Sequence, residues 1–422
     1  MSKHPHKPVP ARVEELEILS VGGQGDGVAA GHVFVPLTLP GERARVRVEG
    51  DRGEVLELLE ASPERIAPVS PHYGECGGCA LQHWAAEPYL AWKREQVRLA
   101  LGRERLETEI ADTIACPPAS RRRLALHARP GKGGGAALGF KARRSWRLVE
   151  ITSCPVADPA LVRALPGLRA LAAAFLEHPK SAPTLHVTAT LSGLDVDVTG
   201  VERKSGGLSA DRRMQAAEAA AAADLARVTM SGEIIYMARQ PTVRFGPATV
   251  ALPAGSFLQA TPQAEEAMAR LTLDAVAGAG RLADLFCGAG TFTFRMAELA
   301  PVFAADAHEP AVRALKSAIA TAPGLKPITA ETRDLFRAPV VAEEMKKIDA
   351  IVFDPPRAGA AAQTLEIARS KAATVVGISC NPATFARDAR VLVNAGFQLE
   401  KVTPVDQFLW SPHIEVVGVF RR

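Results

Sequence analysis

Residues 281–290 read RLADLFCGAG, and this stretch decides the fold of the C-terminal part of the chain. A short apolar run ends in Asp284-Leu-Phe, and a turn with Gly288 and Gly290 follows at once. Glycines in a turn after a buried strand allow the backbone to approach a ligand closely. Beyond this turn the run VFAAD ends in Asp306, whose carboxylate can accept both hydroxyl groups of a ribose. The pattern predicts a strand, a glycine turn and a helix, either at a nucleoside-binding edge or as a tight turn in an α/β domain that binds no nucleotide.

The alternation of apolar runs and helical segments continues from about residue 264 to the C-terminus. The runs RLADLF, VFAAD, IDAIVF and TVVGIS are separated by segments of helix length, which predicts an α/β fold with a parallel, doubly wound sheet. The last two runs, FQLEKVTPV and IEVVGVF, are joined by a short loop, and we expect them to pair antiparallel at one edge of the sheet. Ligands of such sheets bind at the carboxyl ends of the strands.

Polar side chains follow the later strands at this carboxyl edge. Asp334 stands in the third turn, and Asp354 begins DPPR, where two prolines stiffen the loop after the fourth strand. Cys380 ends the fifth strand in SCNP and could be core filler, a metal ligand or a nucleophile. A nucleophile fits best, because filler would sit inside the strand and no further metal ligand is close in sequence.

Charged residues near Cys380 in sequence or in the expected fold bear on this chemistry. Arg357 and Arg387 would favour its thiolate form if the fold brings either guanidinium close. Glu415 lies just inside the last strand near the same edge, which makes it a candidate proton acceptor. Taken alone, Glu415 is better explained as a surface charge on an edge strand, and only the neighbouring motifs indicate a base.

The N-terminal half has a different pattern. Residues 11–60 contain short β-rich runs broken by GGQGDG and PGE, which predict a five-stranded barrel of the oligonucleotide-binding kind. A helix is expected over about 86–106, a hairpin over 184–200, and an alanine-rich helix with Ser209 as its N-cap. Between the first helix and the hairpin lies a basic segment, residues 121–147, which has no acidic residue and contains the aromatic residues Phe140 and Trp146. Its basic residues are Arg121, Arg122, Arg123, Arg129, Lys132, Lys141, Arg143, Arg144 and Arg147.

Composition narrows the class of protein. Hydrophobic residues make up 47% of the 422 residues and charged residues 23%, as expected for packed domains. We expect no membrane-spanning segment, because no apolar run is long enough, and the polar start of the chain does not resemble a secretory signal. A cytoplasmic protein is therefore expected. The net charge of +4 is weak evidence for a polyanionic partner, but the one-sign basic segment could neutralise phosphates, while its aromatic side chains stack on bases.

The motifs together carry a family resemblance. GSFLQATPQ, DLFCGAG, RDLF, DPPR, SCNPATFARD and SPHIE, in this order, resemble the bacterial RNA uracil-5-methyltransferases, which modify uridines of 23S rRNA and transfer RNA. The resemblance implies a class I methyltransferase domain with a seven-stranded sheet over 246–422. It also implies an N-terminal barrel similar to the TRAM module over 1–62 and a central RNA-binding region over 63–245. A monomer acting on RNA is expected.

The resemblance also assigns roles to residues. It implies that Cys380 is the nucleophile that adds to carbon 6 of uracil and that Glu415 removes the proton from carbon 5. S-adenosylmethionine is the implied methyl donor. Thr291 stands where members often carry Asn, and Asp306 where they often carry Glu. The residues implied to bind this cofactor are Gln259, Phe286, Thr291, Asp306, Asp334 and Asp354.

A cysteine segment, HYGECGGCALQHW, precedes the basic region. Its CxxC pair, Cys76 and Cys79, could bind zinc, form a redox pair or belong to a larger metal site. In the related rRNA branch four cysteines hold a [4Fe–4S] cluster, and Cys154 matches the distant ligand. Position 70, where the first ligand is expected, is Ser70. We expect a retained cluster on the three matching thiols.

Several functions remain open. Methylation of 23S rRNA is favoured over transfer RNA, because the barrel and the CGGC segment are features of the rRNA branch. An RNA cytosine-5-methyltransferase would usually carry its nucleophile in a Pro-Cys turn on the fourth strand, where this chain has DPPR. A non-catalytic iron–sulfur RNA-binding protein is the alternative from another class, and the intact Cys380 and Glu415 argue against it.

Overall fold

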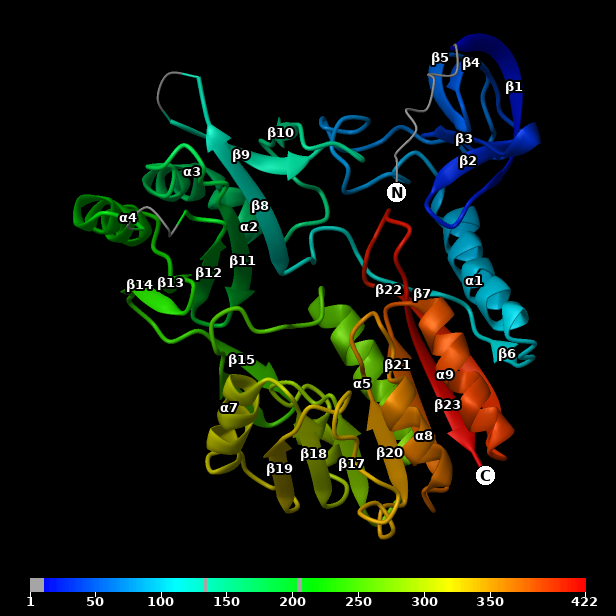
Figure 1. Cartoon of the computed structure of the whole chain (residues 1–422), viewed down its shortest axis with the longest axis vertical. Coiled ribbons are helices and arrows are strands. Elements are labelled where there is room, and N and C mark those ends of the chain that lie inside the picture. The colour runs from blue at the N-terminus through cyan, green and yellow to red at the C-terminus, as the bar shows by residue number, and fades with distance from the viewer. Residues whose placement is uncertain (1–10, 133–134, 203–206) are drawn as a thin grey trace, which may run out of the picture.

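The computed structural model describes residues 11–132, 135–202 and 207–422, so the polar start of the chain lies outside the described residues. Figure 1 shows three parts: a small barrel in blue, a central sheet in cyan and green, and a large C-terminal sheet that runs from green to red. Helix α1 (Ala86–Arg103) runs from beside the barrel to the helices of the C-terminal part. No helix in the described ranges is long and apolar enough to cross a membrane.

The N-terminal strands close into a five-stranded barrel with the order β1-β2-β3-β5-β4, as predicted. Burial alternates strictly along β4, which places Ala44, Val46 and Val48 inside and three arginines outside. These outward arginines form cross-strand ion pairs with glutamates of β5 at 2.5–2.9 Å. The strands are β1 (Arg12–Val21), β2 (Asp26–Ala29), β3 (Val33–Pro36), β4 (Arg43–Glu49) and β5 (Arg52–Glu60), with a short 3-10 turn η1 (Ala30–His32).

The central region is a seven-stranded sheet with the order β10-β9-β8-β11-β12-β13-β14. The predicted hairpin is present as the antiparallel pair β11 and β12, and Ser209 caps α4 by accepting a hydrogen bond from the backbone of Arg212. Helices α3 and α4 pack on the sheet and on each other. The strands are β8 (Arg123–Pro130), β9 (Ala136–Lys141), β10 (Leu148–Glu150), β11 (Thr184–Thr190), β12 (Gly193–Thr199), β13 (Arg227–Met230) and β14 (Glu233–Met237). The helices are α2 (Pro159–Arg163), α3 (Leu165–Ala174) and α4 (Ala210–Ala222).

The C-terminal sheet is doubly wound and mostly parallel, as predicted, but it contains nine strands where seven were expected. Its order is β19-β18-β17-β20-β21-β23-β22-β6, and β7 also pairs with β22. The additional strands, β6 (Glu109–Ile110) and β7 (Ile114–Ala115), come from the segment after α1 and use the free edge of β22. Two-residue strands carry no alternation that a sequence reading can detect. The other strands are β17 (Leu282–Leu285), β18 (Val302–Asp306), β19 (Ile328–Thr332), β20 (Ala350–Phe353), β21 (Thr374–Ser379), β22 (Gln398–Asp406) and β23 (Glu415–Arg421).

Helices cover both faces of this sheet (Figure 1). Helix α9 packs on α8 and on α1, so the N-terminal helix belongs to one helical layer of the C-terminal sheet. Helix α5 contacts β21, β22 and β23, and a two-stranded ribbon of β15 and β16 packs against α7. These elements are α5 (Pro262–Val276), α6 (Thr293–Met296), α7 (Glu309–Ile319), α8 (Ala361–Arg369), α9 (Pro382–Asn394), β15 (Thr242–Phe245) and β16 (Ala248–Ala251).

A buried carboxylate joins the barrel to the central region. Asp26 is 1% exposed. It forms ion pairs with two arginines that follow β9, Arg143 at 2.8 Å and Arg144 at 2.9 Å. A third ion pair, at 3.2 Å, joins it to Arg52 of the barrel. Arg143 also donates to the backbone oxygen of Gln24. A carboxylate with so little exposure needs such donors, because its charge is otherwise uncompensated. Two arginines of the predicted RNA-binding segment therefore serve this junction.

Candidate active site

Strand pairing brings the two candidate catalytic residues side by side. Strands β21 and β23 are antiparallel, and Ser379 of β21 pairs with Val416 of β23. The next position along each strand is Cys380 on one and Glu415 on the other, so these two residues face each other across the pair. Asp354 directly follows the neighbouring strand β20, which pairs with β21 on its other side. The three side chains come from separate segments and meet at one edge of the sheet.

Cys380 is partly exposed at the tip of β21. Burial raises the pKa of its thiol to about 11, the carboxylates of Glu415 and Asp354 add to this, and Arg357 opposes it. The thiol is therefore protonated at neutral pH in the protein alone, and Arg357 is the cation that favours its ionisation. Arg387, the other predicted cation, instead pairs with Asp388 at 2.7 Å and donates to the backbone oxygen of Ala358.

Asn381 holds the Cys380 turn in place. Its side-chain oxygen caps α9 by accepting from the backbone of Ala383 at 3.1 Å, and its side-chain nitrogen donates to the backbone oxygen of Arg357 at 3.1 Å. Thr384 donates to the same oxygen. The loops after β20 and β21 are thus tied together, so that the thiol, Asp354 and Arg357 keep one arrangement.

Glu415 is 3% exposed and belongs to the interior rather than to a charged strand surface. Burial raises the pKa of its carboxyl well above the usual value, and the charge of Asp354 adds to this. Gln407, at the end of β22, donates a hydrogen bond to Glu415 Oε1 at 2.6 Å. A buried carboxylic acid with a raised pKa is a stronger base once it is ionised.

Gln259 connects Glu415 and Gln407 to Asp354. Its side-chain nitrogen donates to Asp354 Oδ2 at 2.9 Å, and its side-chain oxygen accepts from Gln407 at 2.9 Å. Burial raises the pKa of Asp354 to about 7, and the hydrogen bond from Gln259 opposes the rise. Gln407 was not predicted: a single polar residue at the end of an apolar strand carries no signal of its partners.

The glycine turn forms the other end of the site. Gly288 donates its backbone N–H to Asp306 Oδ2 at 2.9 Å, and His308 donates its own to Asp306 Oδ1 at 2.7 Å. Each oxygen keeps a further lone pair for a ligand hydroxyl. Phe286 and Gly288 have positive φ angles, +65° and +54°, which make the turn tight. Thr291 is partly buried just beyond the turn, and its backbone oxygen accepts from Arg295.

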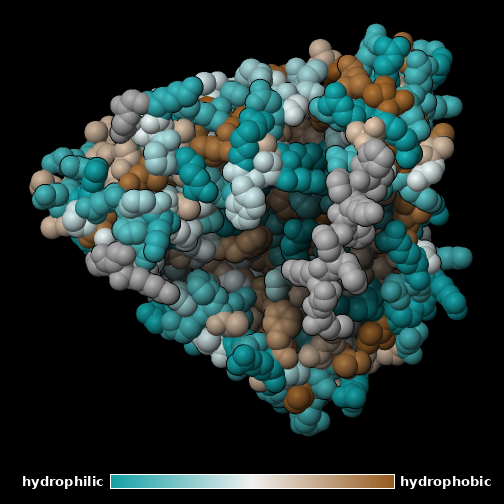
Figure 2. All heavy atoms as spheres, turned by 45° about the horizontal axis from the view of Figure 1, so that its top comes forward, coloured by the Kyte–Doolittle hydropathy of each residue, from teal (hydrophilic) through white to brown (hydrophobic). Residues whose placement is uncertain are grey.

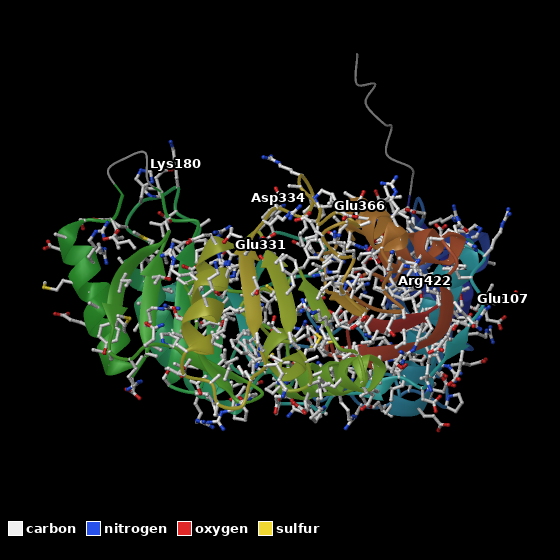
Figure 3. All side chains as sticks on the ribbon, turned by 90° about the horizontal axis from the view of Figure 1, so that it is seen from below. Glu107, Lys180, Glu331, Asp334, Glu366 and Arg422 are labelled. Atoms are coloured by element: carbon white, nitrogen blue, oxygen red, sulfur yellow. The ribbon has the colours of Figure 1, made fainter. Side chains whose placement is uncertain are left out.

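Two aromatic rings lie beside this turn. The Phe286 and Phe336 rings are 5.6 Å apart between centroids, with planes inclined by 58°. Asp334 lies two residues before Phe336 on the loop after β19, close to the surface (Figure 3), and its carboxylate accepts from the backbone of Phe336 at 3.0 Å. The predicted positions 286 and 334 are thus joined through Phe336, which was not predicted and is 47% exposed.

The carboxylates between these two ends suit a cationic ligand. Asp284 is fully buried, accepts a hydrogen bond from Thr293 at 2.5 Å, and has one oxygen without a hydrogen-bond partner among the described residues. Burial raises the pKa of Asp284 to about 7, and the charges of Asp354 and Asp306 add to this. A sulfonium ion near three clustered carboxylates would be stabilised by their field, so these residues fit S-adenosylmethionine.

The cysteine segment does not fit the predicted cluster. Cys76, Cys79 and Cys154 line one small cavity with Ser70, but no three Cys, His, Asp or Glu side chains within residues 11–132, 135–202 and 207–422 are arranged to hold a metal ion. Ser70 Oγ instead accepts a hydrogen bond from the backbone of His72 at 3.2 Å. Burial raises the pKa of the Cys79 thiol to about 12, with Cys154 adding to this. The prediction of an iron–sulfur cluster gains no support from this arrangement.

The first three arginines of the basic segment have different surroundings. Arg122 is buried and pairs with Glu265, so it supports structure, whereas Arg123 lies 5.1 Å from the exposed ring of Phe257. Arg121 lies 5.7 Å from the Phe408 ring and forms no ion pair with any described residue. It lines a cavity of about 490 Å³ between the barrel, the cysteine segment, the central sheet and the loop before Glu415. Figure 2 shows the molecule hollowed between the barrel and the central region.

The fold and the site define the class of protein. A doubly wound sheet with a glycine turn, an acid after the second strand and an antiparallel last strand is the class I methyltransferase fold, as predicted. A Pyrococcus abyssi tRNA (uracil-54, C5)-methyltransferase, solved in complex with S-adenosyl-L-homocysteine, has the same fold. Its TM-score is 0.73 at 23% identity, over 96% of this chain and 99% of that one.

Sequence comparison identifies the family. Residues 248–422 match the model of the tRNA (uracil-5-)-methyltransferase family. A Caulobacter vibrioides protein described as an uncharacterized RNA methyltransferase is 66% identical over 97% of this chain and 100% of its own length. The Chromohalobacter salexigens 23S rRNA (uracil(1939)-C(5))-methyltransferase RlmD is 32% identical over 98% of this chain and 90% of its own. The chain belongs to the RNA uracil-5-methyltransferase family and is an enzyme of that class, as its motifs predicted.

Proposed function

We propose that this enzyme transfers a methyl group from S-adenosylmethionine to carbon 5 of a uridine in 23S rRNA, with Cys380 as nucleophile and Glu415 as base. The observation that carries the proposal is the register of β21 and β23, which sets Cys380 against Glu415 beside Asp354. The 23S rRNA target is supported by the match to RlmD over most of both chains. Transfer RNA is the second candidate, supported by the name of the matching family model.

The chemistry follows from the weakness of carbon 5 as a nucleophile. Cys380 first loses its thiol proton to solvent. Its Sγ, as thiolate, then adds to carbon 6 of uracil, and the electron pair of the carbon 5–carbon 6 double bond moves into an enolate. S-adenosylmethionine, when bound, would supply the methyl group to carbon 5, with its sulfur–methyl bond breaking and S-adenosylhomocysteine as the leaving group. Glu415 removes the proton from carbon 5, the double bond reforms, and Cys380 leaves. Covalent addition thus replaces one difficult step by several easier ones.

Each end of the site has a role in this scheme. Asp306 would bind the ribose of the cofactor, and Phe286 with Phe336 would hold its adenine near Asp334. Thr291 and Gln259 would line the pocket between them. Asp354, held by Gln259, would lie between the cofactor and the uracil edge. The proposal includes no step through an iron–sulfur cluster, because the residues present do not fit one.

The RNA would enter through the cavity beside Arg121. The Arg121 guanidinium donates a hydrogen bond to the backbone oxygen of Arg123 and forms no ion pair with any described residue. A guanidinium without an ion pair, next to an aromatic ring, is suited to a phosphate or a base. Trp146 is 79% exposed on the turn after β9, with Lys141 Nζ 3.9 Å from its ring centroid, and would offer a second stacking surface. The target base must leave its stack to reach Cys380, so a loop or loosened helix is the expected substrate. The barrel would act as a TRAM-type RNA-binding module.

One chain supplies every group that this reaction needs, so we propose that the enzyme acts as a monomer in the cytoplasm, where ribosomal RNA is modified. Light scattering of the purified protein checks the monomer. The test of function is transfer of labelled methyl groups to 23S rRNA from cells that lack this enzyme, with 5-methyluridine mapped afterwards. Cys380→Ala should abolish transfer, whereas Cys116→Ala, which removes a buried thiol from the wall of the cavity beside Arg121, should not. Full transfer by Cys380→Ala would refute the mechanism.

A further inference from the structure

Gln407 occupies a fixed position between two segments of the active site. It is 2% exposed, and its side-chain oxygen accepts a hydrogen bond from the backbone N–H of Ala260 at 2.6 Å. A backbone N–H can only donate, so this contact determines which end of the amide is the oxygen. The side-chain nitrogen must then face the other way, toward Glu415 Oε1 at 2.6 Å and Gln259 Oε1 at 2.9 Å.

Glu415 depends on this single donor. Within the described part of the chain, Gln407 is the one group that donates a hydrogen bond to its carboxylate, and no cation forms an ion pair with it. The titratable groups that face it are Asp354 and Arg357 on the loop after β20 and Cys380 at the end of β21. Asp354 disfavours a charge on Glu415, and only Arg357 and Gln407 favour one. A carboxylate 3% exposed is otherwise expected to remain protonated.

The same donor reaches the opposite carboxylate through one further amide. Gln407 donates to Gln259, whose own nitrogen donates to Asp354 Oδ2 at 2.9 Å. The donor and acceptor ends of both amides are thus fixed: the hydrogen bonds run from the N–H of Ala260 through the two side-chain amides to the carboxylates of Glu415 and Asp354. Turning either amide would set nitrogen against nitrogen or oxygen against oxygen and would leave a buried polar atom unpaired.

We propose that Gln407 is a positioning residue that favours the ionised form of Glu415 and aims it at carbon 5, and that links it through Gln259 to Asp354. This inference rests on the proposed function of Glu415 as the base. Gln407 itself does not touch the reacting atoms: it acts through the carboxylate that it holds. Proton removal from carbon 5 follows methyl transfer. Loss of the Gln407 side chain should therefore slow proton removal and leave the addition of Cys380 and the binding of RNA intact.

The experiment measures the single-turnover release of free methylated RNA from the covalent adduct, against pH, for the wild type and for Gln407→Met, which keeps the shape and removes the donor. A hydrogen bond to a charged group changes an equilibrium constant by about tenfold to a hundredfold. The rate at neutral pH should therefore fall by at least about tenfold. The acidic limb of the profile should move up by about one pH unit. A covalent protein–RNA adduct should accumulate in the variant, while the Kd for RNA stays at the wild-type value.

A matched control and a second variant complete the design. Gln363 is equally buried, on α8, and makes two hydrogen bonds to the backbone of Val340, so Gln363→Met removes a comparable amide outside the site. That variant should keep the wild-type pH profile. Gln407→Glu keeps the acceptor for Ala260 and adds a charge beside Glu415, so it should move the acidic limb further up than Gln407→Met.

The outcomes separate this inference from the proposed function. If wild-type protein methylates uridine and both Gln407 variants keep its acidic limb, Gln407 does not set the state of Glu415. A uniform loss of rate with an unchanged profile and no adduct would equally overturn it, because that result indicates a structural role. If the wild type methylates no uridine in any RNA, the proposed function itself fails.

Discussion

A buried ion pair holds the active-site loop, and breaking it is the most demanding test of this structure. Lys93 of α1 and Asp406 at the end of β22 are both 0% exposed, with Lys93 Nζ 2.9 Å from Asp406 Oδ1. Lys93 also donates to the backbone oxygen of His413, and Tyr89 donates to Asp406 at 2.7 Å. The loop 407–414 between β22 and β23 is therefore fixed at both ends by one helix. The perturbation is Lys93→Met, which keeps most of the side chain and removes its charge.

The expected cost is large because the remaining charge cannot reach water. Removing one partner of a buried ion pair costs about 3–5 kcal/mol, since the other is left uncompensated. Asp406 keeps only the hydrogen bond from Tyr89, and the oxygen of His413 loses its donor. In a domain of this size, 3–5 kcal/mol corresponds to a fall in Tm of about 10 °C. Because Gln407 follows Asp406 directly, methyl transfer should fall as well.

The assay is thermal unfolding followed by tryptophan fluorescence, with methyl transfer measured at a temperature where all variants are folded. Arg94→Met is the control: Arg94 is next on the same helix, and its ion pair with Asp112 is largely exposed, so it should cost less than about 1 kcal/mol. The double variant Lys93→Met with Asp406→Asn should recover part of the loss, because it leaves no lone charge. A Tm for Lys93→Met within about 2 °C of the wild type would refute the reasoning.

Four further outcomes are expected. Glu415→Gln should trap a covalent adduct between Cys380 and RNA, visible as a retarded band on a denaturing gel; absence of the band would contradict the role of the base. Asp26→Asn should destabilise the contact between the barrel and the central region by about 1–3 kcal/mol, seen as faster hydrogen exchange there; unchanged exchange would contradict the junction. The raised pKa of Asp284, about 7 against about 3.9 in the unfolded chain, means that its contribution to stability falls as pH rises from about 4 to 7, and Asp284→Asn should flatten the dependence of Tm on pH over this interval. Ser70→Cys should bind iron and absorb visible light, whereas the wild type should hold no stoichiometric iron after anaerobic purification; iron and sulfide analysis decides this.

Local patterns in the chain were enough for the fold class and for most of the site. Apolar runs of strand length, a glycine turn and polar residues after successive strands all depend on neighbours within a few positions. For this reason the parallel sheet, the barrel, the hairpin and the edge that carries Cys380 and Asp354 were predicted. Glu415 was placed near that edge, although in isolation its position indicated a surface charge.

The failures have a common cause. A basic segment indicates charge but not the partner of each cation, so Arg143 and Arg144 were expected at RNA and instead bind Asp26. The three matching thiols line one small cavity, but no described residues are arranged to hold a metal ion, so the predicted cluster gains no support. Strands of two residues have no period to detect, and β6 and β7 were missed for that reason.

The sequence by itself thus determined which residue types stand at the ends of which strands, because that information is contained in short stretches of chain. Only the tertiary structure decided which of them meet. The Lys93–Asp406 pair joins residues 313 positions apart, and the path from Glu415 through Gln407 and Gln259 to Asp354 crosses four segments. Such contacts depend on strand order and register, and hydrogen bonds act only over about 3 Å. Buried charge and its partners are therefore properties of the folded chain.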